Sequence, residues 1–312
     1  MTTIPAAIGR TPASRGLVGR PDVNRRRMAR LGWGFSAPAL IIIAVVTIFP
    51  IVYSVVMSLS NVTVTSNGIN LGGATGHNYV VMGTNPTWQY AIGFTIIYTI
   101  ITVLVELVLG TLIALVLQRL AAGRGWMMAL LLIPWSMITV INAELWQYIY
   151  EGTYGVAGAL FGLHDILGNS TQAIIGLMIA DIWKTTPFVA IIVLAGLVML
   201  PGDIYEAAEV DGSSGWSTFW RITVPLLRPT LALAVMFRVL QAFGLFDLPW
   251  VMTNGGPGDS TTSLAILGYK AMFQNLSFGP GAAVATTTAL LVLLGCLISL
   301  RGFKVQVGKE GT

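Results

Sequence analysis

Six long apolar runs, nearly free of charge, constrain this chain more than any other feature of its sequence. Each is about 20 residues or longer, which at roughly 1.5 Å per helical residue is enough to cross the hydrocarbon core of a bilayer. The sequence therefore predicts an all-α, polytopic membrane protein with six transmembrane helices. The predicted spans are about 33–58, 91–117, 126–150, 173–199, 229–251 and 281–300.

The composition agrees with a membrane protein and excludes several kinds of site. Hydrophobic residues make up 55% of the chain, charged residues only 10%, and the mean hydropathy is +0.78, which leaves too little polar surface for a soluble globule. A single cysteine, Cys296, excludes an intramolecular disulfide and a cysteine-based zinc site. Two histidines, His77 and His164, are too few for a histidine-rich metal cluster. We expect no metal site.

The positions of the basic residues predict the orientation. All but three of the 17 Lys and Arg residues fall on one side if the N-terminus is cytoplasmic, and cytoplasmic loops are the ones enriched in Lys and Arg. Of the three exceptions, Lys270 lies in an outer loop, while Lys184 and Arg238 lie within spans. Both termini and the central segment 201–229 are therefore predicted to be cytoplasmic. Because the charge is distributed in this way, the basic pI of about 9.3 does not indicate nucleic-acid binding.

The runs and the loops between them give the predicted domain organisation. The outer loop 61–90 could be a lid or a connector, and the last outer loop, 252–280, opens with the turn cluster Thr253–Pro257 and continues with a short helix. The predicted parts are a disordered basic cytoplasmic tail (1–30), a first transmembrane helix (31–60), an extracytoplasmic loop (61–90), a membrane core (91–301) that contains the segment 201–229, and a cytoplasmic tail (302–312).

The central segment, Pro201–Pro229, is a polar island between two apolar runs. Asp203 and Glu206 are spaced as in a capping box, which predicts a helix start at that point. Gly212 and Gly215 should interrupt this helix, and a second short helix should end at the prolines Pro225 and Pro229. We expect these helices to present a shallow surface, made of Ala207, Ala208 and Gly212.

The spacing within this island resembles the EAA loop of ABC importer permeases. The matching residues are Glu206, Ala207, Ala208, Gly212, Ile222 and Pro225, with Asp211 directly before the glycine. In that family the loop is a coupling helix that docks in a cleft of a cytoplasmic ATPase. The stretch Phe243–Pro257 is similar to the one that follows this loop in sugar permeases of the maltose, trehalose and glycerol-phosphate type. The resemblance covers roughly residues 90–301 and implies the type I importer permease fold in a bacterial cell membrane.

Charged residues at bilayer depth are costly, so their positions carry information. Asp181 and Lys184 share one face of the fourth span, and Arg238 lies at a matching depth in the fifth, which predicts an ion pair between Asp181 and Arg238. The pair could fix the register of two helices, or it could belong to a polar lining for a hydroxyl-rich solute. Glu106 and Glu144 each stand alone in their spans and are interpreted as helix–helix hydrogen-bonding groups.

The resemblance favours the second interpretation, because solute is contacted from these two helices in maltose-type permeases. It implies a substrate pathway, with Trp183 and Phe188 available to stack on sugar rings, formed by Asp181, Trp183, Lys184, Thr185, Phe188, Arg238, Gln241 and Asp247. Lys184 and Arg238 carry more charge than a neutral sugar needs, which keeps acidic and phosphorylated solutes open.

The chain has no phosphate-binding Gly-x-x-x-x-Gly-Lys-Ser/Thr loop, so it is not expected to be an enzyme or to hold a cofactor. The resemblance implies a non-catalytic permease subunit that imports a di- or oligosaccharide. Its expected partners are a second permease subunit, two ATP-binding subunits that bind ATP and Mg²⁺, and an extracytoplasmic solute-binding protein.

Two other functional classes share features with this sequence. A stand-alone proton- or ion-coupled carrier would use Asp181 or Glu106 as its titrating group, and it remains the alternative. An intramembrane serine hydrolase built on Gly212–Gly215 is excluded, because no histidine follows His164 to activate a serine.

Overall fold

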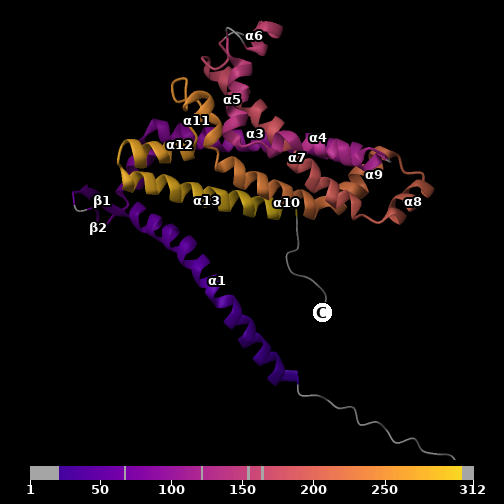
Figure 1. Ribbon diagram of the computed structural model, residues 1–312, viewed down its shortest axis with the longest axis horizontal. Coiled ribbons are helices and arrows are strands. Elements are labelled where there is room, and N and C mark those ends of the chain that lie inside the picture. The colour runs from indigo at the N-terminus through magenta and orange to yellow at the C-terminus, as the bar shows by residue number, and fades with distance from the viewer. Residues whose placement is uncertain (1–20, 67, 121, 153–154, 163–164, 304–312) are drawn as a thin grey trace, which may run out of the picture. The chain divides into compact units, whose positions relative to one another are not determined.

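The computed structural model describes residues 21–66, 68–120, 122–152, 155–162 and 165–303, and these are almost entirely helical (Figure 1). The long helices are α1 (Pro21–Ser58), α3 (Pro86–Arg119), α7 (Ser170–Val198), α10 (Val224–Phe243) and α13 (Phe278–Gly302). The shorter ones are α2 (His77–Thr84), α4 (Arg124–Ser136), α5 (Thr139–Tyr150), α6 (Val156–Phe161), α8 (Gly202–Val210), α9 (Gly215–Thr218), α11 (Asp247–Thr253) and α12 (Leu264–Tyr269). Two π-helical turns, η1 (Phe219–Thr223) and η2 (Lys270–Gln274), complete the helical elements among these residues.

The chain divides into two compact units, residues 1–52 and 53–312. In the first unit, the described part of α1 exposes apolar side chains around its whole circumference from Leu31 to Val52, as expected of a helix whose surroundings are lipid or another protein. α1 begins at Pro21, so the prediction of a disordered tail was wrong for residues 21–30. The remainder of that tail, and residues 304–312 of the C-terminal tail, lie outside the described residues.

Five described helices are long and apolar enough to cross a membrane, and the pair α4 and α5 makes a sixth candidate span. This pair is bent by 88° at Met137 and Ile138, both of which have extended backbone. Pro134 lies inside α4 just before the bend and lacks the N–H that would continue the helix. The predicted continuous span 126–150 is therefore broken, and the predicted span 229–251 ends early, at Phe243.

The segment 59–90, predicted to be an outer loop, is folded. Strands β1 (Ser60–Thr65) and β2 (Gly68–Ala74) form an antiparallel hairpin, which α2 follows. The amide of Asn78 on α2 is buried and donates to the carbonyl oxygens of Ser58 and Ser60, both at 2.9 Å. These bonds satisfy backbone acceptors where α1 ends and tie the hairpin to α2.

Within residues 53–312, the long helices α3, α7, α10 and α13 pack along one another. α3 and α7 approach closely at Gly110, where an added Cβ would lie 2.7 Å from a methyl group of Val189. A small residue at that point lets two helix backbones come together, as is common in membrane bundles. In Figure 1, α8 and α9 lie at one end of this bundle, α11 and α12 lie toward the other, and α5 and α6 project from its side near α11.

The buried apolar residues of the bundle separate into clusters at its two ends. One cluster includes Tyr98, Leu177 and Leu248, near the end that carries α11. Another includes Leu117, Leu197 and Leu227, near the end that carries α8. The charged groups described next lie between these two clusters along α3, α7 and α10, and so at mid-depth in the bundle.

Candidate functional site

The segment between Pro201 and Pro229 begins with α8, at the end of the bundle that also carries α9. α8 starts at Gly202 and has no side-chain cap, so the predicted capping box of Asp203 and Glu206 was wrong. The helix starts earlier than that prediction assumed, which places Asp203 in its first turn instead of at its N-cap. There the carboxylate complements the positive end of the helix dipole without a capping hydrogen bond.

Gly212 ends α8 in a Schellman motif. The N–H of Ser213 donates to the carbonyl of Ala208 at 2.9 Å, and the N–H of Gly212 donates to the carbonyl of Glu209 at 3.0 Å. This closure requires a left-handed residue at Gly212, whose φ is +72°, and glycine adopts that region without a steric cost. The predicted interruption at Gly212 is confirmed, with a specific backbone reason for it.

α8 presents one polar face and buries the other. Glu206, Ala207 and Gly212 are exposed, whereas Ala208 is buried, which corrects its predicted place on the exposed surface. The hydroxyl of Tyr205 lies 3.2 Å from that of Thr223 and fastens α8 to η1. The exposed surface of α8 is therefore held on a fixed base.

The second half of the segment was predicted to be a separate short helix. It is instead the start of a continuous helix from Gly215 to Phe243. Ser214 caps it, accepting from the N–H of Ser217 at 3.3 Å. The helix continues past Pro225 because the turn before it, η1, is π-helical, and its wider turn relieves the crowding that proline causes in an α-turn. Ile222 lies half-buried in this turn.

At mid-depth, three helices bring together a buried ionic cluster, which we define as Glu106, Asp181 and Arg238. Arg238 on α10 is 2% exposed, and its Nη2 donates to Oε1 of Glu106 at 2.8 Å and to Oδ2 of Asp181 at 3.1 Å. Its Nε also donates to Glu106, and its Nη1 donates to Gln241 at 2.9 Å. The predicted pair of Asp181 and Arg238 is confirmed.

Glu106 was predicted to stand alone in its span, but it is the main partner of Arg238. Its carboxylate also accepts from the hydroxyl of Thr185 at 2.6 Å, so Glu106 ties α3 to both α7 and α10. Depth gave only a weak signal for this contact: Glu106 lies about fifteen residues into the predicted span, roughly 22 Å from its predicted outer end, against roughly 17 Å for Arg238. Glu144, by contrast, is exposed on α5.

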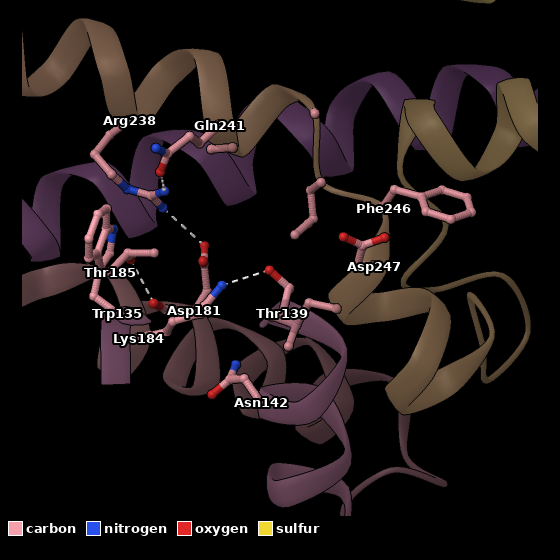
Figure 2. Close-up of a pocket in the computed structure, with 14 residues that line it drawn as sticks. Trp135, Thr139, Asn142, Asp181, Lys184, Thr185, Arg238, Gln241, Phe246 and Asp247 are labelled. Atoms are coloured by element: carbon pink, nitrogen blue, oxygen red, sulfur yellow. Dashed lines mark hydrogen bonds and ion pairs between the residues drawn. The ribbon is translucent and has the colours of Figure 1, made fainter. Parts of the chain in front are cut away.

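A cavity of about 390 Å³ lies against the ionic cluster (Figure 2). Six of the predicted pathway residues line it: Asp181, Lys184, Thr185, Arg238, Gln241 and Asp247. The lining residues that the sequence did not single out include three from α4 and α5, namely Trp135, Thr139 and Asn142. Sequence reasoning missed them because the run 126–150 was treated as one straight span, although the three-residue spacing of Thr139 and Asn142 marks a polar face.

The aromatic side chains are arranged differently from the prediction. Neither Trp183 nor Phe188 lines the cavity. Trp183 packs edge-on against Trp146, with ring centroids 5.7 Å apart, and Phe188 stacks on Trp135, with centroids 5.5 Å apart. The aromatic side chains that the cavity presents are therefore Trp135, with Phe188 behind it, and Phe246.

Among the described residues, two carboxylates and two cations line this cavity, and the carboxylate of Glu106 lies behind them. Arg238 is already engaged by Glu106 and Asp181, and Nζ of Lys184 donates to the hydroxyl of Thr139 at 2.6 Å. Asp247, at the start of α11, adds a third carboxylate to the two of the cluster. The site offers hydrogen-bonding groups and two aromatic side chains, Trp135 and Phe246, but no excess of positive charge.

Comparison with known proteins identifies the family. The family described as "Binding-protein-dependent transport system inner membrane component" matches residues 107–306. The trehalose/maltose transport system permease protein MalF of Thermococcus litoralis is 36% identical over 283 residues, covering 88% of this chain and 94% of that protein. The trehalose transport system permease protein SugA of Mycobacterium tuberculosis is 34% identical over 279 residues, covering 88% and 87%.

A solved structure supports the same fold. A bacterial alginate ABC transporter, crystallised in complex with an alginate pentasaccharide-bound periplasmic protein, contains a chain that matches with a TM-score of 0.77 at 19% identity, over 91% of this chain and 99% of that one. At this identity the likeness shows the fold alone, which is that of a type I importer permease. This chain is a multi-pass membrane protein that belongs to the family of binding-protein-dependent transport system inner membrane components.

Proposed function

We propose that this chain is the permease subunit of an ATP-driven importer that carries a sugar, a di- or oligosaccharide, into the cytoplasm. The observation that carries this proposal is the mid-depth cavity, lined from α4, α5, α7, α10 and α11, in a chain whose relatives include permeases named for trehalose and maltose. A site at mid-depth between helices is the arrangement that alternating access requires, because rocking of the helices can open it to either side in turn.

The complete importer needs partners that supply the energy and deliver the solute. The chain has no phosphate-binding loop, so ATP and Mg²⁺ would bind to two partner ATPase subunits, and a second permease would complete the pathway. We assign ATPase coupling to the segment Glu206–Pro225, with the exposed Glu206, Ala207 and Gly212 as the docking surface. Ala208 and Ile222 would support that surface from below, and Asp211 borders the turn.

The test is to purify the chain with its co-expressed permease, ATPase and binding-protein partners and to reconstitute them in vesicles. We expect ATP-dependent uptake of a disaccharide, with trehalose and maltose as the first probes. We also expect ATPase activity to rise when the binding protein is loaded, because a loaded binding protein that favours the ATP-competent conformation raises the population of that conformation. Accumulation of sugar by the isolated chain without any nucleotide hydrolase would instead support the stand-alone carrier.

The charge balance around the cavity predicts that the solute is neutral. Asp181 and Asp247 balance Lys184 and Arg238 in the lining, so an anionic sugar would meet carboxylates as well as cations, and like charges facing each other are costly. We expect uptake of neutral disaccharides to exceed that of a sugar phosphate or a uronic-acid disaccharide by about tenfold or more, a difference that corresponds to ~1.4 kcal/mol. Competition for uptake of radiolabelled trehalose measures this, and equal competition by the anionic sugars would contradict it.

The proposed orientation places both termini and α8 in the cytoplasm of a bacterial cell. Cys296 is the only cysteine, so Cys296→Ala gives a background free of thiols. In that background, Val210→Cys on α8, where the native side chain is 88% exposed, should react with a membrane-impermeant maleimide only in inverted vesicles. Asn275→Cys, at an exposed position beyond η2, should react only in intact cells or right-side-out vesicles. The opposite pattern would reverse the orientation and remove the coupling assignment.

A further inference from the structure

Asn142 stands out among the residues that line the cavity. It lies in the first turn of α5, directly after the bend, and its side chain is completely buried. Neither its Nδ2 nor its Oδ1 has a hydrogen-bond partner among the described residues. In Figure 2, Asn142 lies beside Thr139 and Lys184, which are joined by a hydrogen bond from Nζ to Oγ1.

The other buried polar side chains of the lining are paired. Arg238 makes hydrogen bonds to Glu106, Asp181 and Gln241, and the hydroxyl of Thr185 donates to Glu106. An unpaired amide in the same lining carries the desolvation penalty of both a donor and an acceptor. Native proteins leave few such groups, and one that lines a cavity is accounted for if a ligand completes its hydrogen bonds.

We propose that Asn142 is a specificity-determining contact for the transported solute, and that its amide recognises a pair of neighbouring hydroxyl groups on a sugar ring. A primary amide presents a donor and an acceptor side by side, and each sugar hydroxyl can both donate and accept, so the two pairs match without any net charge. This inference rests on the proposed function, since it names the group that reads the hydroxyl pattern in the same cavity.

The decisive variant is Asn142→Leu, which replaces the amide by an apolar group of nearly the same shape. If Asn142 is only a buried polar residue, this change removes an unpaired amide and should leave the fold as stable as before or more so. If Asn142 reads the solute, uptake of the transported disaccharide by the complete complex should fall by about tenfold or more, because a hydrogen-bonded contact is lost. Asn142→Gln, which keeps the amide on a longer stem, should retain part of the uptake.

Discrimination between sugars separates recognition from a general defect. The wild-type complex should prefer the parent disaccharide over a monodeoxy analogue that lacks one of the two recognised hydroxyls, and Asn142→Leu should lose that preference. Thr186→Val is the matched control, because the Thr186 hydroxyl on α7 is also buried and unpaired but lies outside the cavity lining. We expect its uptake and its sugar preference to stay within about twofold of wild type.

The outcomes distinguish this inference from the function on which it rests. Normal uptake by Asn142→Leu, with an unchanged preference against every monodeoxy analogue, would overturn the role of Asn142 while the wild-type complex still imports sugar. Absence of ATP-dependent sugar uptake by the wild-type complex itself would overturn the proposed function, whatever the variants do.

Discussion

Replacing Arg238 by glutamine should reduce solute uptake by roughly 100-fold and destabilise the protein, the largest combined effect that we expect from a single substitution. The substitution leaves the carboxylates of Glu106 and Asp181 without their shared cation, at a place where Glu106 is completely buried. Breaking a buried ion pair by removing one partner typically costs about 3–5 kcal/mol. Thermal unfolding in detergent measures the stability, and uptake by the reconstituted complex measures the transport.

A second variant separates the structural role of the ionic cluster from a role in solute binding. The triple variant Glu106→Gln, Asp181→Asn, Arg238→Met removes all three charges, so no uncompensated charge remains buried, and we expect it to regain most of the stability that Arg238→Gln loses. If Asp181 and Arg238 contact the solute, uptake by this stable triple variant stays low. Wild-type uptake by the triple variant would show that the cluster only holds the helices in register.

Depth within the membrane was the most informative property of the sequence for this site. Counting residues from the span ends placed Asp181 and Arg238 at matching levels, and the structure confirms their contact. The same count carried less weight for Glu106, because α3 extends from Pro86 to Arg119, beyond both ends of the predicted span 91–117. A helix longer than the bilayer is thick leaves the depth of its residues uncertain, since its tilt and its position along the membrane normal are set by its neighbours.

The lining contributed by α4 and α5 could not be predicted, because it depends on a bend. Pro134 lies within an apolar run that is long enough to be one span, and proline inside membrane helices often causes only a kink. The bend of 88° is what turns Thr139 and Asn142 toward the cavity. The sequence also could not show that Trp135 lines the site and Trp183 does not. The side to which each ring points is set by packing between helices and not by local sequence.

Gly212 and Asp203 show where local rules succeed and fail in the coupling segment. The interruption at Gly212 was predictable, because a left-handed C-cap strongly favours glycine and the Schellman hydrogen bonds follow from the same backbone geometry. The structure does not contain the predicted capping box. The same sequence pattern is compatible with helix starts that differ by a residue or two, and here the start at Gly202 places Asp203 inside the first turn.

Reversing the charge of Glu206 should uncouple transport while leaving the chain folded. Glu206 is exposed on α8, and none of the hydrogen bonds or ion pairs within the described residues requires it, so Glu206→Lys should change the stability of the chain by about 0.5 kcal/mol or less. A charge at a docking surface contributes far more to the binding of the partner than to the stability of its own chain. Reversing that charge places a like charge against a cation on the partner or removes a charge-assisted hydrogen bond. We expect uptake to fall about 100-fold, which corresponds to ~2.7 kcal/mol at the ATPase contact.

The matched control is Glu209→Lys, which makes the same charge change on the same helix. Glu209 is also exposed and lies one helical turn beyond Glu206, but at about 100° per residue it is on the side of Glu206 that faces away from Ala207. If docking uses the surface of Glu206, Ala207 and Gly212, Glu209→Lys should lower uptake only about threefold or less, whereas a general electrostatic effect would make the two variants alike. Co-purification of the ATPase subunits with each variant identifies the step that is lost. Undiminished uptake by Glu206→Lys, with the ATPase bound as in wild type, would remove α8 as the element through which ATP hydrolysis moves the cavity.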